Sequence, residues 1–490
     1  MARTERVVIL IWDGMRPDFV RPELTPHLCA FAARSARYTR ATGVFPTVTL
    51  ANTASLVTGT YPDRHGIAAN IFVGPPGDRA PIDGTRRDDL GRLRRVNAGR
   101  VLPCQTLTEA VVSSGKRMVV ITSSSAGQAT LLDPEGVAIT IGPEYMSSDA
   151  HRAAVIARCG PLPPKAVYDN AADEWLHDVL IEYILPDLAP DIVLCWLNEP
   201  DTSQHAAGLG SPEALAVIRS NDAQLGRVLD AVARDGVRTT VIVASDHGHS
   251  TVTGMHQIGD ELTAAGFARE VAAGTIRFAK NDLVIEEGLD TDRLRERVGR
   301  WLFTRSWVGA VINWGEPIPG MLAPAQVWSD DRPSALAFTP TFSYSYIWGE
   351  ETNAFGIAGT EETFAYGGQE DYDQLQGPVR GLNRLRSTHG TLSPFDLRTT
   401  LVLGGAGVRD GVTLDMPAGV IDLAPTALAL LGLPPLPRAD GRVLDEAFVD
   451  GPMPATISMR SEHLADLRGG PLYRHWIGTT AYLDTGRGNN

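Results

Sequence analysis

The sequence predicts an α/β fold built on a doubly wound, mostly parallel sheet, with a region inserted late in the chain. Three apolar, β-branched runs alternate with helical patterns, which is the rhythm of parallel sheets covered by helices on both faces. The runs lead into Asp13, Asp201 and Asp246. A later stretch of 141 residues, between His247 and His389, lacks that rhythm. These observations predict one α/β core that carries an insertion.

The strands of this sheet are predicted from continuous apolar runs, which are typical of parallel strands buried on both faces. Residues 7–12 form the first run and residues 191–197 the second, and the third is the segment TTVIVAS. An amphipathic pattern predicts a helix over residues 170–187. A long helix is predicted between Ser211, its N-cap, and Gly236, which marks its end.

The domain organisation follows from where this rhythm stops and resumes. Residues 1–250 and 386–450 are predicted to form the core, because strand and helix patterns return at LRTTLVLGG and VIDLAPTALALLGLP. Residues 251–385 are rich in aromatic and turn residues, so we predict an inserted cap over the site that contributes substrate contacts. Residues 451–490 are predicted to extend the core at its C-terminal end.

Composition and charge narrow the class of partner. Hydrophobic residues make up 43% and charged residues 21% of the 490 residues, as in an ordinary soluble globular protein. The formal net charge of −14 argues against a nucleic-acid polymer or an anionic membrane as the main partner. No run approaches the length of about 20 apolar residues that a membrane span needs. The sequence leaves the oligomeric state open.

The cysteines and the N-terminus indicate a compartment. Cys29, Cys104, Cys159 and Cys195 are isolated, without a CxxC spacing, so we expect free thiols and a reducing environment. The apolar stretch before Asp13 is too short for a secretory signal. Together these features predict a cytoplasmic protein.

Acidic and imidazole side chains follow the predicted strands and recur late in the chain. They are Asp13, Asp201, His205, Asp246, His247 and His389. Open parallel sheets place their ligands at the carboxyl ends of the strands, so we expect these side chains to converge there. Three carboxylates and three imidazoles, together with a threonine oxygen, suffice for two cation sites. Nitrogen and oxygen ligands without cysteine suit zinc or manganese, and the share of histidine favours zinc.

Two threonines stand just before a helical pattern that stops at Gly59, in the segment FPTVTLANTASLVTG. They are Thr47 and Thr49. A hydroxyl at a helix N-terminus lies among unpaired backbone N–H groups and is well placed to meet a phosphate. On its own the segment also fits an ordinary capped surface helix. Its combination with the acids and histidines favours the phosphate site.

Taken in order, these segments resemble the nucleotide pyrophosphatase/phosphodiesterase family of the alkaline phosphatase superfamily. The matching pieces are the strand-end Asp13 and the segments FPTVT, TGTYPDRHGIAAN, EPDTSQH, SDHG and THG, which fall within residues 7–390. As a set they are highly specific, although EPD, SDHG or THG alone would carry little weight. The resemblance implies an alkaline phosphatase-like core and a small anionic phosphoester or nucleotide as substrate.

The resemblance also implies roles for individual residues. The ligand sets it implies are Asp201, His205 and His389 for one zinc ion, and Asp13, Thr49, Asp246 and His247 for the other. Manganese or iron could replace zinc. Thr49 would be the nucleophile and Asn70 would hold a phosphoryl oxygen, whereas Thr47 aligns with no catalytic role.

Two further residues bear on a nucleotide substrate. Trp196 lies five residues before Asp201, where the family usually carries an aromatic side chain that stacks on a nucleobase. A tryptophan of the hydrophobic core is the alternative interpretation. Leu50 follows Thr49, where the family often places an aromatic residue on the other wall of that slot. The resemblance thus implies substrate contacts by Trp196 and Leu50, in a slot that is aromatic on one side only.

Other polar residues near these motifs are predicted to be structural. His249 and His256 lie close to the SDHG segment but have no counterpart in the set of motifs. Residues 74–100 contain seven arginines in a stretch rich in Gly, Pro and Asp. This composition predicts a solvated loop with a short helix.

The expected function is that of a two-metal phosphoric ester hydrolase, namely a phosphodiesterase or nucleotide pyrophosphatase that acts through a phosphothreonine intermediate. Two enzymatic alternatives stay open: a phosphomonoesterase, and a C–P bond hydrolase that resembles phosphonoacetate hydrolase. Close relatives of the latter carry paired lysines where this chain has Ser123, Ser124 and Ser125. A non-catalytic binding protein is disfavoured, because no ligand position is lost.

Overall fold

The computed structural model describes most of the chain. The described residues are 3–163, 170–288, 290–328, 340–349, 351–352, 358–359, 361–366 and 386–485.

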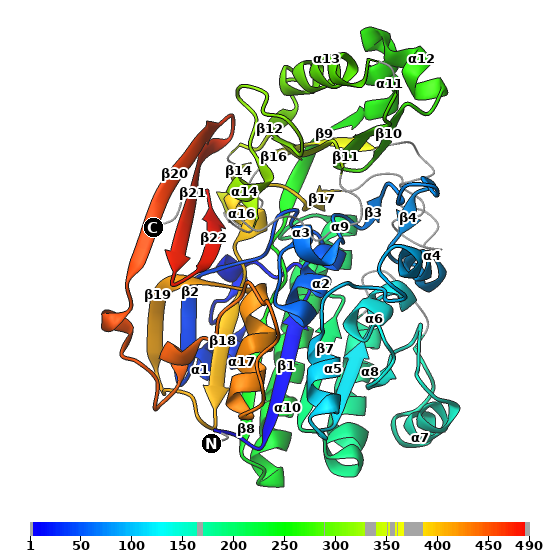
Figure 1. The fold of residues 1–490 in the computed structure, drawn as a ribbon. Helices are drawn as coiled ribbons and strands as arrows, with labels where there is room; N and C mark the ends of the chain where they lie inside the picture. The colour runs from blue at the N-terminus through cyan, green and yellow to red at the C-terminus, as the bar shows by residue number, and fades with distance from the viewer. Residues whose placement is uncertain are drawn as a thin grey trace.

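The core is an eight-stranded sheet in the order β19-β2-β18-β8-β1-β7-β5-β6 (Figure 1). In this order the strands are β19 (Val412–Gly419), β2 (Ala36–Thr42), β18 (Leu401–Gly405), β8 (Thr239–Ala244), β1 (Arg6–Trp12), β7 (Ile192–Leu197), β5 (Met118–Thr122) and β6 (Ile139–Ile141). β18 runs antiparallel to its neighbours β2 and β8, and the other neighbouring pairs are parallel. The predicted α/β fold with a mostly parallel sheet is confirmed.

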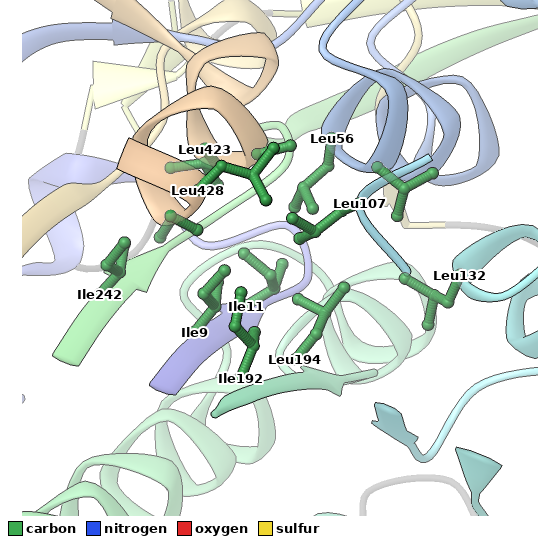
Figure 2. Packing of buried hydrophobic residues seen from close by; sticks show 14 of the residues in the cluster. Ile9, Ile11, Leu56, Leu107, Leu132, Ile192, Leu194, Ile242, Leu423 and Leu428 are labelled. Carbon is green, nitrogen blue, oxygen red and sulfur yellow. The ribbon is translucent and has the colours of Figure 1, made fainter. Parts of the chain in front are cut away.

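Helices cover both faces of this sheet. On one face lie α2 (Thr49–Thr58), α5 (Leu107–Ser113), α6 (Ala126–Leu132) and α17 (Leu423–Leu430); on the other lie α1 (Pro26–Ala32), α7 (Asp149–Cys159), α8 (Ala171–Val179) and α10 (Pro212–Asp235). Successive side chains of a strand point to opposite faces, so β1 contributes to two cores. Ile9 and Ile11 pack in the first core, and Leu10 packs in the second. Figure 2 shows Ile9 and Ile11 beneath Leu56 of α2 and Leu428 of α17.

The predicted elements agree with the structure at several places. β1 covers the predicted strand over residues 7–12, and all of its residues are buried. α10 begins after Ser211, whose Oγ accepts a hydrogen bond from the Ala214 N–H, and ends at Gly236 with φ 73°. The helix predicted over 170–187 is present as α8, which continues into the π-helical segment η3 (Leu180–Leu188).

Beyond β8 the chain builds a second sheet, which is antiparallel and has the order β10-β11-β13-β12. Its elements are β10 (Ile276–Ala279), β11 (Asp282–Ile285), β12 (Val308–Asn313) and β13 (Phe342–Tyr346), with α11 (Ile258–Leu262), α12 (Ala268–Ala272) and α13 (Thr291–Phe303). This part has its own apolar core and lies at the top of Figure 1. It falls within the predicted cap, residues 251–385. Residues 367–385 of that cap lie outside the described residues, and the domain boundaries remain a prediction.

The described C-terminal segment forms an antiparallel sheet of β20 (Met459–Leu467), β21 (Gly470–Ile477) and β22 (Thr480–Asp484). It lies beside β19 at the edge of the main sheet (Figure 1). The Tyr482 hydroxyl donates a hydrogen bond to Asp422 Oδ2 at 2.9 Å, which links this sheet to the core. All four cysteines are free thiols. Within the described ranges, no helix combines the length and apolarity that crossing a bilayer requires.

Candidate active site

The acidic side chains follow three adjacent strands of the sheet. β8, β1 and β7 are parallel neighbours, so their carboxyl ends lie side by side. Asp13 directly follows β1, Asp246 follows β8 by two residues, and Asp201 begins α9 (Asp201–Ala207) after β7. A segment from far along the chain joins them, where β17 (Ser387–Thr388) leads into His389. The convergence expected from the sequence is therefore present.

One group of ligand-type atoms surrounds the Oδ1 oxygen of Asp201. The Nε2 atoms of His205, His389 and His249 lie 3.3, 3.4 and 3.2 Å from this oxygen. All four ligand-type atoms lie within 4.8 Å of one another. Asp201, His205 and His389 are the residues expected at one cation. His249 was expected to be structural, and the structure instead places it inside the group.

Backbone carbonyls orient two of these imidazoles. Nδ1 of His205 donates to the carbonyl of Ser387 at 2.8 Å, and Nδ1 of His389 donates to the carbonyl of Thr47 at 2.7 Å. In the neutral form each ring then presents its Nε2 lone pair to Asp201. Lone pairs that face a carboxylate oxygen repel it, and a bound cation removes the conflict. Such carbonyl contacts are usual for metal-binding histidines.

The electrostatics of Asp201 reflect the imidazoles around it. Burial alone would raise the pKa of this carboxyl, but the neighbouring imidazoles, His205 foremost, hold the pKa well below its usual range. Burial lowers the pKa of His249 to about 3 and takes the pKa of His389 well below its usual value. Burial therefore favours the neutral form of the His249 and His389 rings, and the neighbouring imidazoles favour the ionised form of Asp201.

A second group of atoms gathers around Nε2 of His247. This nitrogen lies 3.3 Å from Asp13 Oδ1, 3.1 Å from Asp246 Oδ2 and 3.3 Å from Thr49 Oγ1. Nδ1 of His247 donates to the carbonyl of Gly248 at 2.8 Å, which leaves Nε2 to face the three oxygens. The four residues are those expected at the other cation, and the structure brings all of them together.

In the second group, hydrogen bonds from the described residues do not fully offset the charge of the buried carboxylates. Asp13 Oδ1 and Asp246 Oδ2 are buried, and neither has a hydrogen-bond donor in the described part of the chain. Burial, and then repulsion between the neighbouring carboxylates, raises the pKa of both groups well above its usual value. Buried anions are costly unless cations or donors compensate them. These two oxygens, which have no donor among the described residues, therefore fit a site for a cation.

The spacing within both groups matches tetrahedral coordination. Ligands about 2.0–2.1 Å from a tetrahedral zinc ion lie about 3.3–3.4 Å from one another. The distances from Asp201 Oδ1 and from His247 Nε2 to the other atoms of their groups run from 3.1 to 3.4 Å. Direct N–H···O hydrogen bonds are usually shorter, at about 2.9–3.0 Å. The donor sets thus fit one divalent cation each, and nitrogen with oxygen suits zinc, manganese or iron.

Thr49 is the first residue of α2, so its hydroxyl lies beside backbone N–H groups that have no partner within the helix. The Leu50 N–H donates to Asn70 Oδ1 at 3.1 Å. This contact fixes the orientation of the Asn70 amide, because a backbone N–H must meet the oxygen, and Nδ2 is left to donate elsewhere. α2 ends where the sequence predicts, at Gly59, which has φ 66°. The arrangement suits an anion at the helix N-terminus.

Thr47 forms hydrogen bonds with the segment that carries His389. Its Oγ1 donates to the Thr391 carbonyl at 2.9 Å and accepts from the Gly390 N–H at 3.0 Å. Its own carbonyl accepts the hydrogen bond from His389 Nδ1. Thr47 is therefore a positioning residue for this histidine, a role that the sequence motifs do not indicate.

The structure places Trp196 in the hydrophobic core and not at an open surface. Its side chain is fully buried and packs with Ile11 and Leu194, and its Nε1–H donates to Asp13 Oδ2 at 2.9 Å. Leu50 is 2% exposed and belongs to the same core. Neither side chain offers an open face to a base, so the nucleobase slot expected between them is absent from this part of the structure. The alternative of a core tryptophan describes Trp196.

The arginines of residues 74–100 are largely engaged with carboxylates. The ion pairs are Arg79–Glu286, Arg92–Asp78, Arg95–Asp78, Arg94–Glu135 and Arg100–Glu109. Arg87 lies over the ring of Tyr145, 4.5 Å from its centroid. The short helix predicted here is α4 (Arg87–Arg92). These contacts give the loop a structural role.

Taken together, the sheet and the residues at its strand ends define an alkaline phosphatase-like α/β protein. The sequence profile of the Type I phosphodiesterase / nucleotide pyrophosphatase family matches residues 7–295, which is more than half of the chain. The chain belongs to this family, and the resemblance seen in its motifs is confirmed.

Individual relatives are distant. Human ectonucleotide pyrophosphatase/phosphodiesterase family member 7 is 26% identical over 253 residues, which cover 50% of this chain and 48% of the relative. An uncharacterized pyrophosphatase/phosphodiesterase of Schizosaccharomyces pombe is 24% identical over 252 residues, which cover 49% of this chain and 44% of that protein. The chain therefore spans about half the length of the curated relatives it matches.

Solved structures show the same fold. Murine ectonucleotide pyrophosphatase/phosphodiesterase 5 matches with a TM-score of 0.58 at 17% identity, covering 88% of this chain and 96% of the murine chain. An inactive threonine-to-alanine variant of that murine protein, in complex with AMP, matches with a TM-score of 0.57 at 16% identity and the same coverage.

Proposed function

We propose that this protein is a phosphodiesterase of the nucleotide pyrophosphatase type, which hydrolyses small phosphoric esters through a phosphothreonine intermediate on Thr49. The observation that carries the proposal is the position of Thr49 Oγ1, 3.3 Å from His247 Nε2 and at the first turn of α2. Membership of the phosphodiesterase family supports a hydrolase of this kind. The AMP bound to the murine relative supports a nucleotide as one class of substrate or product.

We also propose that the enzyme works with two divalent cations, zinc before manganese or iron. The proposed ligands are Asp201, His205 and His389 at one site and Asp13, Thr49, Asp246 and His247 at the other. When bound, such cations lower the pKa of a coordinated hydroxyl and stabilise oxygens that gain charge during displacement at phosphorus. The buried carboxylates without donors and the share of imidazole nitrogen support this assignment.

The proposed reaction consists of two successive displacements at phosphorus. Thr49 Oγ1 attacks phosphorus, forms a phosphothreonine ester and releases the first alcohol, which takes up a proton. Water then cleaves the ester, which restores the threonine hydroxyl and releases the remaining half of the substrate as a phosphate monoester. Asn70 Nδ2 and the Thr49 N–H donate to a non-bridging oxygen as negative charge builds on it.

We propose diesters, rather than monoesters, as the preferred substrates. A monoester dianion carries one more negative charge than a diester and is favoured by an additional cationic side chain at the phosphoryl group. Five of the seven arginines in the 74–100 loop pair with carboxylates, which supports the view that they do not bind the phosphoryl group. Since Trp196 and Leu50 are buried, the proposal covers small diesters in general and does not rest on base stacking.

Steady-state kinetics on matched nitrophenyl esters tests the substrate class. We expect kcat/KM for a nitrophenyl nucleotide diester and for bis(4-nitrophenyl) phosphate to exceed the value for 4-nitrophenyl phosphate. A ratio below one would support the monoesterase, and faster phosphate release from phosphonoacetate would support the C–P hydrolase. Thr53→Ala is a matched control for Thr49→Ala, because Thr53 lies one turn later in α2 and donates to the Thr49 carbonyl at 2.8 Å. Thr49→Ala should abolish turnover, whereas Thr53→Ala should retain it.

A further inference from the structure

We infer that His249 is a third imidazole ligand of the cation held by Asp201, His205 and His389, so that this site has four protein ligands. The inference rests on the proposed cation sites and adds a residue that has no counterpart in the family motifs. It concerns the loop SDHGHS, in which His249 stands two residues after His247.

Three rings approach one carboxylate oxygen from three elements. His249 Nε2 lies 3.2 Å from Asp201 Oδ1, the shortest of the three imidazole distances. The His249 ring centroid lies 4.6 Å from that of His205 and 5.3 Å from that of His389, and those two are 5.1 Å apart. His205 comes from α9, His389 follows β17, and His249 immediately precedes β9 (Ser250–Gln257). The rings therefore surround a common point.

A hydrogen bond from His249 to Asp201 accounts for this arrangement less well. The separation of 3.2 Å is long for an N–H···O bond and close to the spacing of about 3.3–3.4 Å between tetrahedral zinc ligands. His205 and His389 already face Asp201 with Nε2, since their Nδ1 atoms donate to carbonyls. With a donor at His249, the carboxylate would still meet two lone pairs. A cation accommodates all four atoms.

The backbone that carries the buried His249 ring is held in place by hydrogen bonds. The residue is fully buried, and its carbonyl accepts a hydrogen bond from Arg16 Nη1 at 3.1 Å. The next residue, Ser250, donates from Oγ to Asp396 Oδ1 at 2.6 Å. Backbone and neighbour are thus fixed, and the ring reaches the group without rearrangement. Its Nδ1 has no partner among the described residues, so nothing else in that part of the structure competes for the orientation of the ring.

Four protein ligands fill the coordination positions of a tetrahedral cation. A substrate oxygen or a water molecule must then enter as a fifth ligand. We therefore expect this site to hold its cation more firmly than a three-ligand site and to accept metals that tolerate five-coordination.

Equilibrium dialysis with zinc tests the inference in solution. His249→Leu keeps the buried volume, and His249→Gln keeps an N–H donor for Asp201 without an imidazole. Both variants should lower the affinity for one of the two zinc ions by at least about 10-fold. His256→Leu is the matched control, because His256 instead bonds to Glu261 and stacks on Trp307. Unchanged zinc affinity in both His249 variants would overturn the inference.

A crystal structure of the zinc-loaded wild-type protein provides a second readout that does not depend on how a variant folds. Anomalous scattering should place a zinc ion about 2.0–2.1 Å from His249 Nε2. Zinc bound to Asp201, His205 and His389 but not to His249 would overturn this inference alone. Absence of zinc from the whole group would contradict the proposed function as well.

Discussion

The indole Nε1–H of Trp196 donates a hydrogen bond to Asp13 Oδ2 at 2.9 Å, so a tryptophan of the core holds a carboxylate of the candidate active site in place. Asp13 Oδ1, the other oxygen, is left to face His247. Hydrogen bonds to ligating carboxylates orient them, and their loss typically lowers metal affinity by about 10–100-fold. We therefore assign Trp196 the role of orienting the Asp13 carboxylate.

Trp196→Phe should therefore weaken zinc binding at the Asp13 site by about 10–100-fold and lower turnover of all esters alike. Trp12→Phe is the control, because the Trp12 indole is also buried in the sheet but its Nε1 has no partner in the described part of the chain. The measurements are zinc affinity and the ratio of kcat/KM between nucleotide and simple diesters. A Trp196→Phe protein that binds zinc normally and loses only the preference for nucleotides would support the stacking role instead.

The alternation along β7 already pointed to the core position of Trp196. Side chains two residues apart share a face, and Trp196 shares one with Ile192 and Leu194, which are both fully buried. The position relative to Asp201 suggested a substrate contact, but a family position does not show whether helices cover that face. Here α2 and α5 supply the covering side chains.

The residues at strand ends were predictable because strand order brings the ends of neighbouring parallel strands together. His249 and Thr47 were harder to predict. Their contacts depend on how the turn after β8 and the segment after β17 close on each other, and these lie more than a hundred residues apart. The only local signal for His249 was its place two residues after His247, a predicted ligand.

Thr49 and Thr47 should respond differently to substitution by alanine. Thr49→Ala removes the nucleophile and should lower kcat by about 10⁴-fold or more, whatever the zinc concentration. Thr47→Ala removes the contacts to Gly390 and Thr391 that position His389, so its smaller loss of activity should recover in excess zinc. Activity measured across a zinc titration checks both. If added zinc restored Thr49→Ala, or Thr47→Ala proved the more damaging, the assignment of the nucleophile would be wrong.

Removal of the cations should destabilise the fold. Without them, the carboxylates of Asp13, Asp246 and Asp201 converge without compensation in a buried site. A cation at about 100 times its Kd contributes about 2.7 kcal/mol to stability for each site that exists only in the folded state. Thermal unfolding with chelator and with excess zinc, together with the number of zinc ions bound at saturation, measures the effect. One zinc ion per chain, or an unchanged Tm after chelation, would contradict a two-cation site.

The burial of His65 predicts that the free energy of unfolding depends on pH. Its Nδ1 accepts from the Ile67 N–H at 3.1 Å, so its Nε2–H donates to Ser55 Oγ at 2.9 Å, and burial lowers its pKa to about 3. Between pH values of about 3 and 6.5, His65 takes up a proton in the unfolded chain but stays neutral in the folded protein. The stability from neutral His65 is therefore fully present above pH 6.5 and is lost as the pH falls.

Relative to His65→Gln, the wild-type free energy of unfolding should fall by about 1.4 kcal/mol between pH 7.5 and pH 5.5. Denaturant titrations at the two pH values measure it. Parallel pH profiles for the two proteins would show that His65 can be protonated within the fold.

The stereochemical course at phosphorus tests the central claim most directly, because it does not require the intermediate to accumulate. A diester made chiral with sulfur at phosphorus is hydrolysed in water enriched in oxygen-18, and the configuration of the product is determined. Two successive in-line displacements, the first by Thr49 and the second by water, predict overall retention. Inversion would mean that water attacks the substrate directly and would contradict a phosphothreonine intermediate.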